Sequence, residues 1–141
     1  MSNVTRPCLI QFPAFGNPSE GYIAVNQFGT SLPFEVIRTF WTYYTPESIT
    51  RGRHAHYNTH MVLVAAAGKI IIDIEEIDGT VSNYILESPT TGLYMPPMTW
   101  HAMQYSHNAI QIVFASSNYD EADYIRDYKV FRSLVKLSTK E

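Results

Sequence analysis

The chain has 141 residues, of which 45% are hydrophobic, 13% aromatic and 16% charged; this balance excludes a disordered chain and predicts one folded domain over residues 1–141. The net charge is −3, from ten Lys and Arg against thirteen Asp and Glu, which argues against a nucleic-acid partner held by a basic surface. Three features predict a cytoplasmic protein without a membrane partner. The chain has a single cysteine, Cys8, its apolar runs are well short of a membrane helix, and its N-terminus is unlike a secretory signal.

Most of the chain is predicted to form β-strands separated by turns. The strand candidates are short runs rich in β-branched, aromatic or apolar residues, and they cover residues 34–44, 61–67, 69–77, 80–86 and 109–115. The dipeptide Asp78-Gly79 is a hairpin signal, and no helix is expected between the strands. This arrangement favours an antiparallel sandwich, barrel or jelly roll.

The strand predicted over residues 34–44 is apolar on both faces. Its even positions carry Phe34, Val36, Phe40 and Tyr44, and its odd positions carry Ile37, Trp41 and Tyr43. Two explanations are equally open. The outer face is either a subunit interface or is covered by a C-terminal helix.

The densest chemical signal is the hexapeptide Arg51-Gly52-Arg53-His54-Ala55-His56. Side chains alternate along a strand, so His54 and His56 project from one face and Arg53 from the other. His60 shares their parity if the strand continues without a bulge, and His101 comes from the distant segment GLYMPPMTWHAM. Such a group suits either a metal site or a proton-transfer site. His107, in a polar Ser-His-Asn turn, is interpreted as a surface residue.

The segment DEADYIRDYKVFRSLVKL predicts a C-terminal helix. Tyr124, Tyr128, Phe131 and Val135 recur at helical spacing. Asp120 is the expected N-cap, and Lys136 near the end suits the helix dipole. We expect this helix to be a packing element that closes the barrel or a dimer.

Three blocks, RGRHAH, GLYMPPMTWHAM and ASSNYDEADYIRDYKVF, resemble in order and spacing the sugar-nucleotide 3,4-ketoisomerases, small cupins that act on dTDP-4-keto-6-deoxy-D-glucose. The similarity runs from about residue 33 to residue 131. It implies an all-β cupin jelly-roll barrel with a short C-terminal helix. It further implies a homodimer with an exchanged N-terminal strand, a dTDP-linked keto-deoxysugar as ligand, and catalysis with no metal and no cofactor.

The resemblance also implies roles for single residues. His54 and His56 correspond to the acid/base pair of the family. Arg51, Arg38, Trp100 and His101 match other positions of its motifs and are expected to bind the substrate. The chain departs from the family pattern at two places. His60 stands where an acidic residue is common, and Glu20-Gly21 stands where Arg-Gly is usual.

The reaction that the resemblance implies moves a ketone from C4 to C3 through an enediol(ate), on the way to a dTDP-3-amino-3,6-dideoxyhexose for a surface glycan such as a lipopolysaccharide O-antigen or an S-layer glycan. Our hypothesis is that His54 and His56 share the proton transfers, with the base and the acid unassigned. Arg38 and Arg51 would hold the diphosphate or polarise the carbonyl oxygens. Trp100 or Tyr43 could stack on thymine, with plain packing as the alternative.

Two other functions compete with this interpretation. The first is a metal-dependent cupin enzyme, with the four clustered histidines as ligands. The second is a non-catalytic cupin that binds a nucleotide sugar. A 3,5-epimerase is disfavoured because the sequence does not reveal the His–Asp pattern that it would need.

Overall fold

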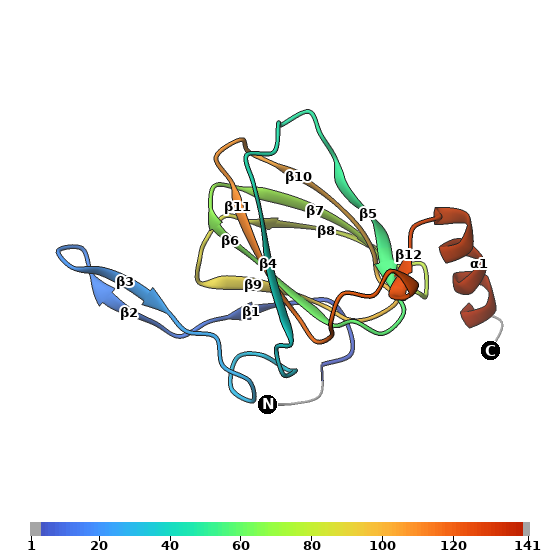
Figure 1. Cartoon of the computed structure of the whole chain (residues 1–141), viewed down its shortest axis with the longest axis horizontal. Helices are drawn as coiled ribbons and strands as arrows, with labels where there is room; N and C mark the ends of the chain where they lie inside the picture. Colours follow the sequence, from blue (N-terminus) through green and yellow to red (C-terminus); the bar gives the residue numbers. More distant parts are fainter. Residues whose placement is uncertain (1–3, 140–141) are drawn as a thin grey trace.

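The computed structural model describes residues 4–139, which form a barrel of two antiparallel five-stranded sheets (Figure 1). One sheet has the strand order β1-β9-β6-β11-β4, the other has the order β12-β5-β10-β7-β8, and β2 and β3 form a separate hairpin. The elements are β1 (Cys8–Gln11), β2 (Ala14–Asn17), β3 (Gly21–Ala24), β4 (Arg38–Tyr43), β5 (Arg51–His56), β6 (Met61–Ala67), β7 (Ile70–Glu75), β8 (Val81–Leu86), β9 (Thr91–Met95), β10 (Trp100–Tyr105), β11 (Ile110–Ala115), the 3₁₀-helix η1 (Glu121–Asp123), β12 (Tyr124–Ile125) and α1 (Tyr128–Thr139).

The main core lies between the two sheets. Leu63, Leu93 and Val113 from one sheet pack with Ile72 and Ile74 from the other, and each is at most 1% exposed. Each of these residues alternates with neighbours on the opposite face of its strand, as period-two geometry requires. The predicted all-β barrel with a short C-terminal helix is therefore confirmed.

Several predicted strands agree closely with the structure. Residues 61–67 form β6, residues 80–86 contain β8, and β7 and β11 begin one residue after their predicted starts. Asp78-Gly79 lies in the turn between β7 and β8, where Gly79 has φ +90°. Seven strands lie outside the predicted runs. Two of them, β5 and β10, are six residues long, and β5 is the strand expected to carry His54 and His56. The others, β1, β2, β3, β9 and β12, are four, four, four, five and two residues long, too short for a periodic signal.

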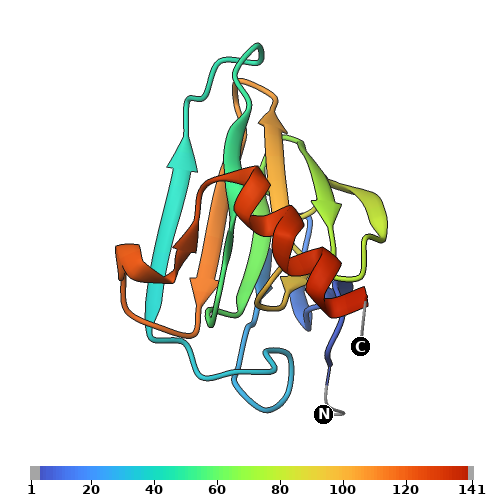
Figure 2. The same ribbon diagram turned by 90° about the vertical axis from the view of Figure 1, so that its right-hand side faces the viewer.

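The strand predicted over residues 34–44 begins only at Arg38, and it forms the edge of its sheet as β4. Trp41 and Tyr43 on its outer face are 62% and 56% exposed. Helix α1 lies across the other sheet, where it contacts β5 and β12 (Figure 2). The explanation that the C-terminal helix covers this face is therefore wrong, and the apolar face is left open.

The C-terminal helix begins later than its predicted N-cap. Asp120 caps the 3₁₀-helix η1 by accepting a hydrogen bond from the Ala122 amide, and β12 follows directly. The Asp127 carboxylate accepts a bond from the Lys129 amide at the start of α1, the contact expected of an N-cap. Tyr124 pairs with His56 in the β12–β5 ladder, so strand pairing overrides its helical spacing. The side chains of Val135 and Lys136 lie outside the described residues.

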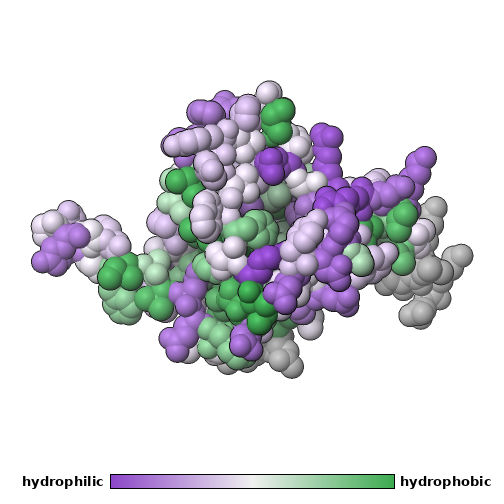
Figure 3. Space-filling model, in the orientation of Figure 1, coloured by the Kyte–Doolittle hydropathy of each residue, from purple (hydrophilic) through white to green (hydrophobic). Residues whose placement is uncertain are grey.

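The hairpin β2–β3 projects away from the barrel (Figures 1 and 3). All eight residues of its two strands are exposed, including Phe15, Tyr22 and Ile23 at 64%, 68% and 68%. Glu20 and Gly21 lie at its turn, where Gly21 has φ +90°. The preceding strand β1 pairs with β9 of its own chain. Among residues 4–139, no helix has the length and apolar character needed to cross a bilayer.

Candidate active site

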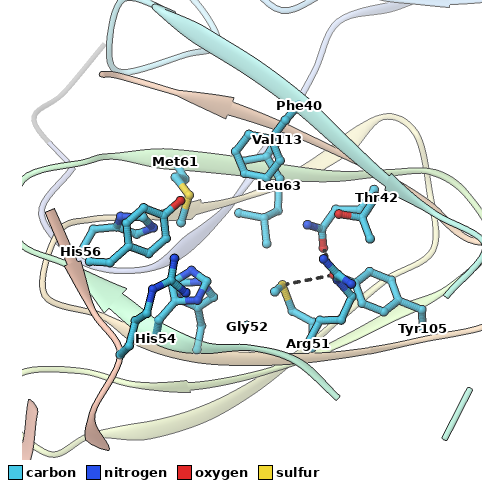
Figure 4. Close-up of a pocket in the computed structure, with 15 residues that line it drawn as sticks. Phe40, Thr42, Arg51, Gly52, His54, His56, Met61, Leu63, Tyr105 and Val113 are labelled. Carbon is cyan, nitrogen blue, oxygen red and sulfur yellow. Dashed lines mark hydrogen bonds between the residues drawn. The ribbon is translucent and has the colours of Figure 1, made fainter. Parts of the chain in front are cut away.

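A cavity of about 210 Å³ opens into the barrel between the two sheets. Figure 4 shows His54 and His56 at one end of it and Arg51, Thr42 and Tyr105 at the other. The side chains between the two ends are apolar, among them Leu63, Val113 and Phe40. The cavity therefore combines convergent polar groups with an apolar wall, as small-molecule sites commonly do.

A bulge in β5 brings Arg51 and His54 to the same side. His101 of β10 pairs with His54, and the next residue, Ala102, pairs with Gly52, so Arg53 has no partner in this ladder. Gly52 and Arg53 have φ +85° and +58°, the left-handed region typical of a bulge. Strict alternation would place residues 51 and 54 on opposite faces. The extra residue reverses this, so Arg51 lines the cavity, and Arg53 faces outward as predicted.

Three of the four clustered histidines converge on the cavity. The ring of His54 lies 5.1 Å from that of His56 and 4.6 Å from that of His101, between centroids. His60 is not part of the group, because β5 ends at His56 and the chain turns before β6. The His60 Nδ1 lies instead 2.8 Å from the Tyr94 hydroxyl. Within the described residues, no set of three or more His, Cys, Asp or Glu is arranged to hold a metal ion.

His56 faces a carboxylate. Its Nδ1 lies 3.2 Å from Asp123 Oδ2, and the ring is 3% exposed. Burial lowers the pKa of His56, and the nearby Asp123 charge opposes that change. Burial alone would raise the pKa of Asp123, but hydrogen bonds from Thr59 and the Asn58 amide, together with the nearby His56, lower it. The structure thus contains a His–Asp pair that the sequence did not reveal, between residues 67 positions apart.

His54 and His101 are neutral histidines at neutral pH. Burial, reinforced by the charge of neighbouring histidines, lowers the pKa of His54 to about 4 and that of His101 to about 3. His101 Nδ1 lies 3.1 Å from the Thr99 carbonyl oxygen, to which it donates. His54 Nδ1 is buried and has no hydrogen-bond partner within the described residues. His56 therefore differs from both neighbours in having an anionic partner.

Arg38 and Arg126 add positive charge near this end of the cavity. The Arg38 guanidinium lies 5.4 Å from the Phe40 ring centre, and its buried Nε has no hydrogen-bond partner in the described part of the chain. Arg126 lines the cavity and lies 4.2 Å over the ring of Tyr124. Both arginines influence His56, since the positive charge of each lowers its pKa. Arg126 is already ion-paired with Glu121 at 2.5 Å, so Arg38 is the guanidinium left to attract an anionic ligand near the histidines.

Two predicted ligand residues lie away from the cavity. The Trp100 ring is 5.1 Å from that of Tyr128 and 5.7 Å from that of Phe131, both in α1. Because neighbouring residues alternate along β10, an inward His101 requires an outward Trp100. Tyr43 lies on the open outer face of β4. The structure does not bring either ring to the histidines.

Sequence reasoning gave no role in the site to several residues that line the cavity or contact its histidines. Asp123, Tyr124 and Arg126 belong to the C-terminal block ASSNYDEADYIRDYKVF, whose similarity to a known family was the available signal. Tyr105 and Gln111 also line the cavity, with their side-chain oxygens 3.1 Å apart. Burial raises the pKa of Tyr105 to about 12, so this phenol is a hydrogen-bond donor at neutral pH.

Comparisons with known proteins agree on one family. A family model described as FdtA, WxcM-like, C-terminal, matches residues 5–136. The TDP-4-oxo-6-deoxy-alpha-D-glucose-3,4-oxoisomerase of Aneurinibacillus thermoaerophilus is 36% identical over 121 residues, which cover 83% of this chain and 84% of that protein.

Two solved structures share the fold. QdtA, a sugar 3,4-ketoisomerase from Thermoanaerobacterium thermosaccharolyticum solved with TDP, superposes with a TM-score of 0.89 at 28% identity, over 96% of this chain and 98% of that one. WlaRA, a TDP-fucose-3,4-ketoisomerase from Campylobacter jejuni, gives 0.85 at 31% identity, over 92% and 96%. These likenesses support the predicted cupin jelly roll.

Proposed function

Because the chain belongs to the FdtA-like family of sugar 3,4-ketoisomerases, which are intramolecular oxidoreductases, we propose that it moves the ketone of dTDP-4-keto-6-deoxy-D-glucose from C4 to C3. The observation that carries this proposal is the convergence of three histidines and Arg51 on one cavity of the barrel. The relatives named above act on, or were solved with, TDP compounds.

The chemistry needs a base, a proton carrier between two oxygens and donors for a developing oxyanion. The C4 carbonyl acidifies the hydrogen on C3, so a base can remove it to give an enediol(ate). The proton is then delivered to C4, while the C3 hydroxyl loses its proton and becomes the ketone. One carbon is oxidised and its neighbour reduced within the same molecule, so the balance needs no external oxidant or reductant.

We assign the carbon-to-carbon proton transfer to His56 and the oxygen protons to His54. The carboxylate beside His56 stabilises the imidazolium that forms when the ring takes a proton. His54 has no such partner, and a ring with a pKa of about 4 stays neutral, which suits a hydrogen bond to a carbonyl oxygen. Arg38 and Arg51 would hold the diphosphate or polarise the carbonyl oxygens.

The decisive experiment is NMR of the product formed from dTDP-4-keto-6-deoxy-D-glucose in deuterated buffer. We expect a 3-ketone, with solvent deuterium entering at the carbons that exchange with His56. Binding of the nucleotide sugar without any 3-ketone would favour the non-catalytic cupin instead. Activity that disappears with a chelator and returns with an added divalent metal would favour the metal-dependent enzyme.

We further propose a homodimer in which the N-terminal region is exchanged. Since β1 pairs within its own chain, the exchanged segment would be the hairpin β2–β3, and an isolated hairpin is only marginally stable in water. Phe15 and Ile23 on the hairpin, and Trp41 on β4, are large exposed apolar side chains that a second copy could cover. Light scattering should give twice the chain mass, and Phe15→Ser/Ile23→Ser should give a monomer.

The product places the enzyme before an aminotransfer reaction. A ketone at C3 is the functional group that an aminotransferase needs to make a 3-amino-3,6-dideoxyhexose linked to dTDP. We propose that the chain acts at this step in the cytoplasm, where the activated sugars for a surface glycan such as an O-antigen or S-layer glycan would be made. Detection of the 3-amino sugar nucleotide in cells that carry the gene, and its loss on deletion, tests this placement.

A further inference from the structure

Main-chain groups hold Asp123 in place by hydrogen bonds, in addition to its contact with His56. Its Oδ1 accepts a hydrogen bond of 2.7 Å from the Asn58 amide, and its main-chain oxygen accepts one of 2.9 Å from the Tyr57 amide. The next residue, Tyr124, pairs with His56 in the β12–β5 ladder. The carboxylate is 11% exposed, so both the main chain and its surroundings hold it in one position.

A second buried group orients the same carboxylate. The Thr59 hydroxyl donates to Asp123 Oδ2, the oxygen that also faces His56 Nδ1. Thr59 is 2% exposed, and its Oγ1 lies 2.6 Å from the Ser117 hydroxyl oxygen. Because the Thr59 proton is used on Asp123, Ser117 donates to Thr59. Every hydrogen bond in this chain of groups therefore points toward the Asp123 carboxylate.

An ionised carboxylate can only accept hydrogen bonds. His56 Nδ1 must therefore carry the proton in the neutral ring, which leaves the lone pair on Nε2. The other groups around His56 are His54 on β5, His101 on β10, the Tyr124 ring, and the cations Arg38 and Arg126. Among the described residues the hydrogen-bond partner of His56 Nδ1 is the Asp123 carboxylate, so the tautomer of His56 depends on Asp123.

We propose that Asp123 is the positioning residue of the proton transfer, because it fixes His56 with the proton on Nδ1 and presents Nε2 to the C3 hydrogen. It also stabilises the imidazolium formed when Nε2 takes that proton. Thr59 and Ser117 hold the carboxylate in place for this task. This inference rests on the proposed function, and it goes beyond it by naming the group that selects the reactive nitrogen.

The first test is Asp123→Asn. The amide of Asn can donate a hydrogen bond to His56 Nδ1 and so favours the tautomer with the proton on Nε2. In that tautomer Nε2 has no lone pair with which to take the proton from C3. We expect kcat to fall on the order of 10⁴-fold, as for other tautomer-setting carboxylates, while KM changes less than about threefold. The remaining activity should have its acid limb at lower pH, since loss of the negative charge lowers the pKa of His56.

Asp120→Asn is the matched control. Asp120 lies three residues earlier, in the same turn, and caps η1; its carboxylate bonds the Ala122 amide and no histidine of the described residues. The variant removes the same charge, and Asn serves equally well as a cap. Its kcat should stay within about twofold of the parent enzyme. A loss similar to that of Asp123→Asn would show that the turn needs its charge only for folding, and would overturn the proposal.

The pair Thr59→Val and Thr59→Ser tests the same chain of hydrogen bonds without changing charge. Val has the shape of Thr but cannot donate to Asp123, whereas Ser keeps the hydroxyl. We expect kcat of Thr59→Val to be about tenfold below that of the parent enzyme, and kcat of Thr59→Ser to lie close to the parent value. If Asp123→Asn fails to fold, this pair decides the question, and equal kcat values for Val and Ser would contradict the proposal.

Nitrogen-15 NMR of the His56 ring reads the tautomer directly in the full chain without substrate. We expect a protonated Nδ1 in the parent enzyme and a protonated Nε2 in Asp123→Asn. An unchanged tautomer, or a parent-like kcat in that variant, would overturn the role of Asp123. If the parent enzyme produces no 3-ketone while its tautomer behaves as described, the proposed function fails and the positioning contact stands.

Discussion

The three cavity histidines have the same side chain but different surroundings, and these set their chemistry. His54 is half-buried and His101 is buried, both beside other histidines, which lowers the pKa of each far below the ordinary value of about 6.5. His56 is buried as well, but Asp123 offsets part of the effect. A site with one supported base and two neutral rings is suited to moving a proton rather than to holding positive charge.

Replacement of His56 should be more harmful than replacement of His54. His56→Asn removes the proposed base, so we expect turnover to fall at least 10³-fold, whereas His54→Asn removes a hydrogen-bonding group and should cost about 10²-fold. Steady-state kinetics and circular dichroism measure the two effects. The control is His107→Asn, because His107 is exposed and, among the described residues, stacks on Tyr44 alone. Near-normal activity in both cavity variants would refute the assignment.

Arg38 should contribute to binding more than to turnover. Its buried Nε has no partner among the described residues, and an unpaired buried donor is costly until an anion reaches it. Arg38→Met should therefore weaken binding of TDP about 10- to 100-fold, measured by calorimetry, with a smaller change in kcat. Arg53→Gln is the control, because Arg53 faces away from the cavity. An equal loss in both variants would indicate a general charge effect instead.

At the scale of elements, the bulged strand β5 decides which side chains enter the cavity. Gly52 is needed there for two reasons: its φ is +85°, and an added Cβ would lie 2.9 Å from Met103 Cε and 3.0 Å from the His101 carbonyl oxygen. A change at Gly52 would therefore disturb both β5 and β10, which together carry the three histidines.

Gly52→Ala should lower both stability and activity. Left-handed backbone costs an alanine roughly 1–2 kcal/mol, and the close contacts add to this by displacing His101. Gly79→Ala is the matched control, since Gly79 has φ +90° but no atom within 4 Å of an added Cβ. We expect urea unfolding to show a lower free energy of unfolding for both variants, and steady-state kinetics to show a lower kcat only for Gly52→Ala. Parent-like kcat in that variant would show that the bulge is not needed for activity.

At the scale of the whole molecule, the buried histidines couple the fold to pH. The unfolded chain binds protons at its histidines near pH 6.5, whereas folded His54 and His101 do so only near pH 4 and 3. Between these limits the unfolded state holds more protons, so the free energy of unfolding falls as pH falls. The barrel should therefore be most stable above about pH 7.

Urea unfolding at pH 7.5 and pH 5.0 measures this linkage. We expect the free energy of unfolding to drop on the order of 4 kcal/mol between the two values, because two histidines each contribute about 1.4 kcal/mol per pH unit over the roughly 1.5 units below pH 6.5. In His54→Asn/His101→Asn the drop should be clearly smaller, whatever the starting stability of the variant. An unchanged drop would show that other groups, such as His56, His60 or the carboxylates, rather than these two histidines, cause the acid sensitivity.

The sequence by itself determined the features that depend on neighbours along the chain. The apolar runs of β6 and β11, the β7–β8 hairpin with its Asp-Gly turn, and the shared face of His54 and His56 all follow from the two-residue period of a strand. The predicted all-β fold class and family are confirmed as well. Both could be predicted because they depend on local patterns and on the order of those patterns along the chain. The roles given to single site residues stay predictions.

Only the tertiary structure decided which distant residues meet. Arg51 faces inward because a bulge shifts the register of β5 against β10, and His60 is excluded because the chain turns after His56. Asp123 reaches His56 from 67 residues away because β12 adds to the edge of β5. Register, bulges and added edge strands depend on partners that no local pattern encodes, so the chemistry of this cavity is a property of the folded barrel.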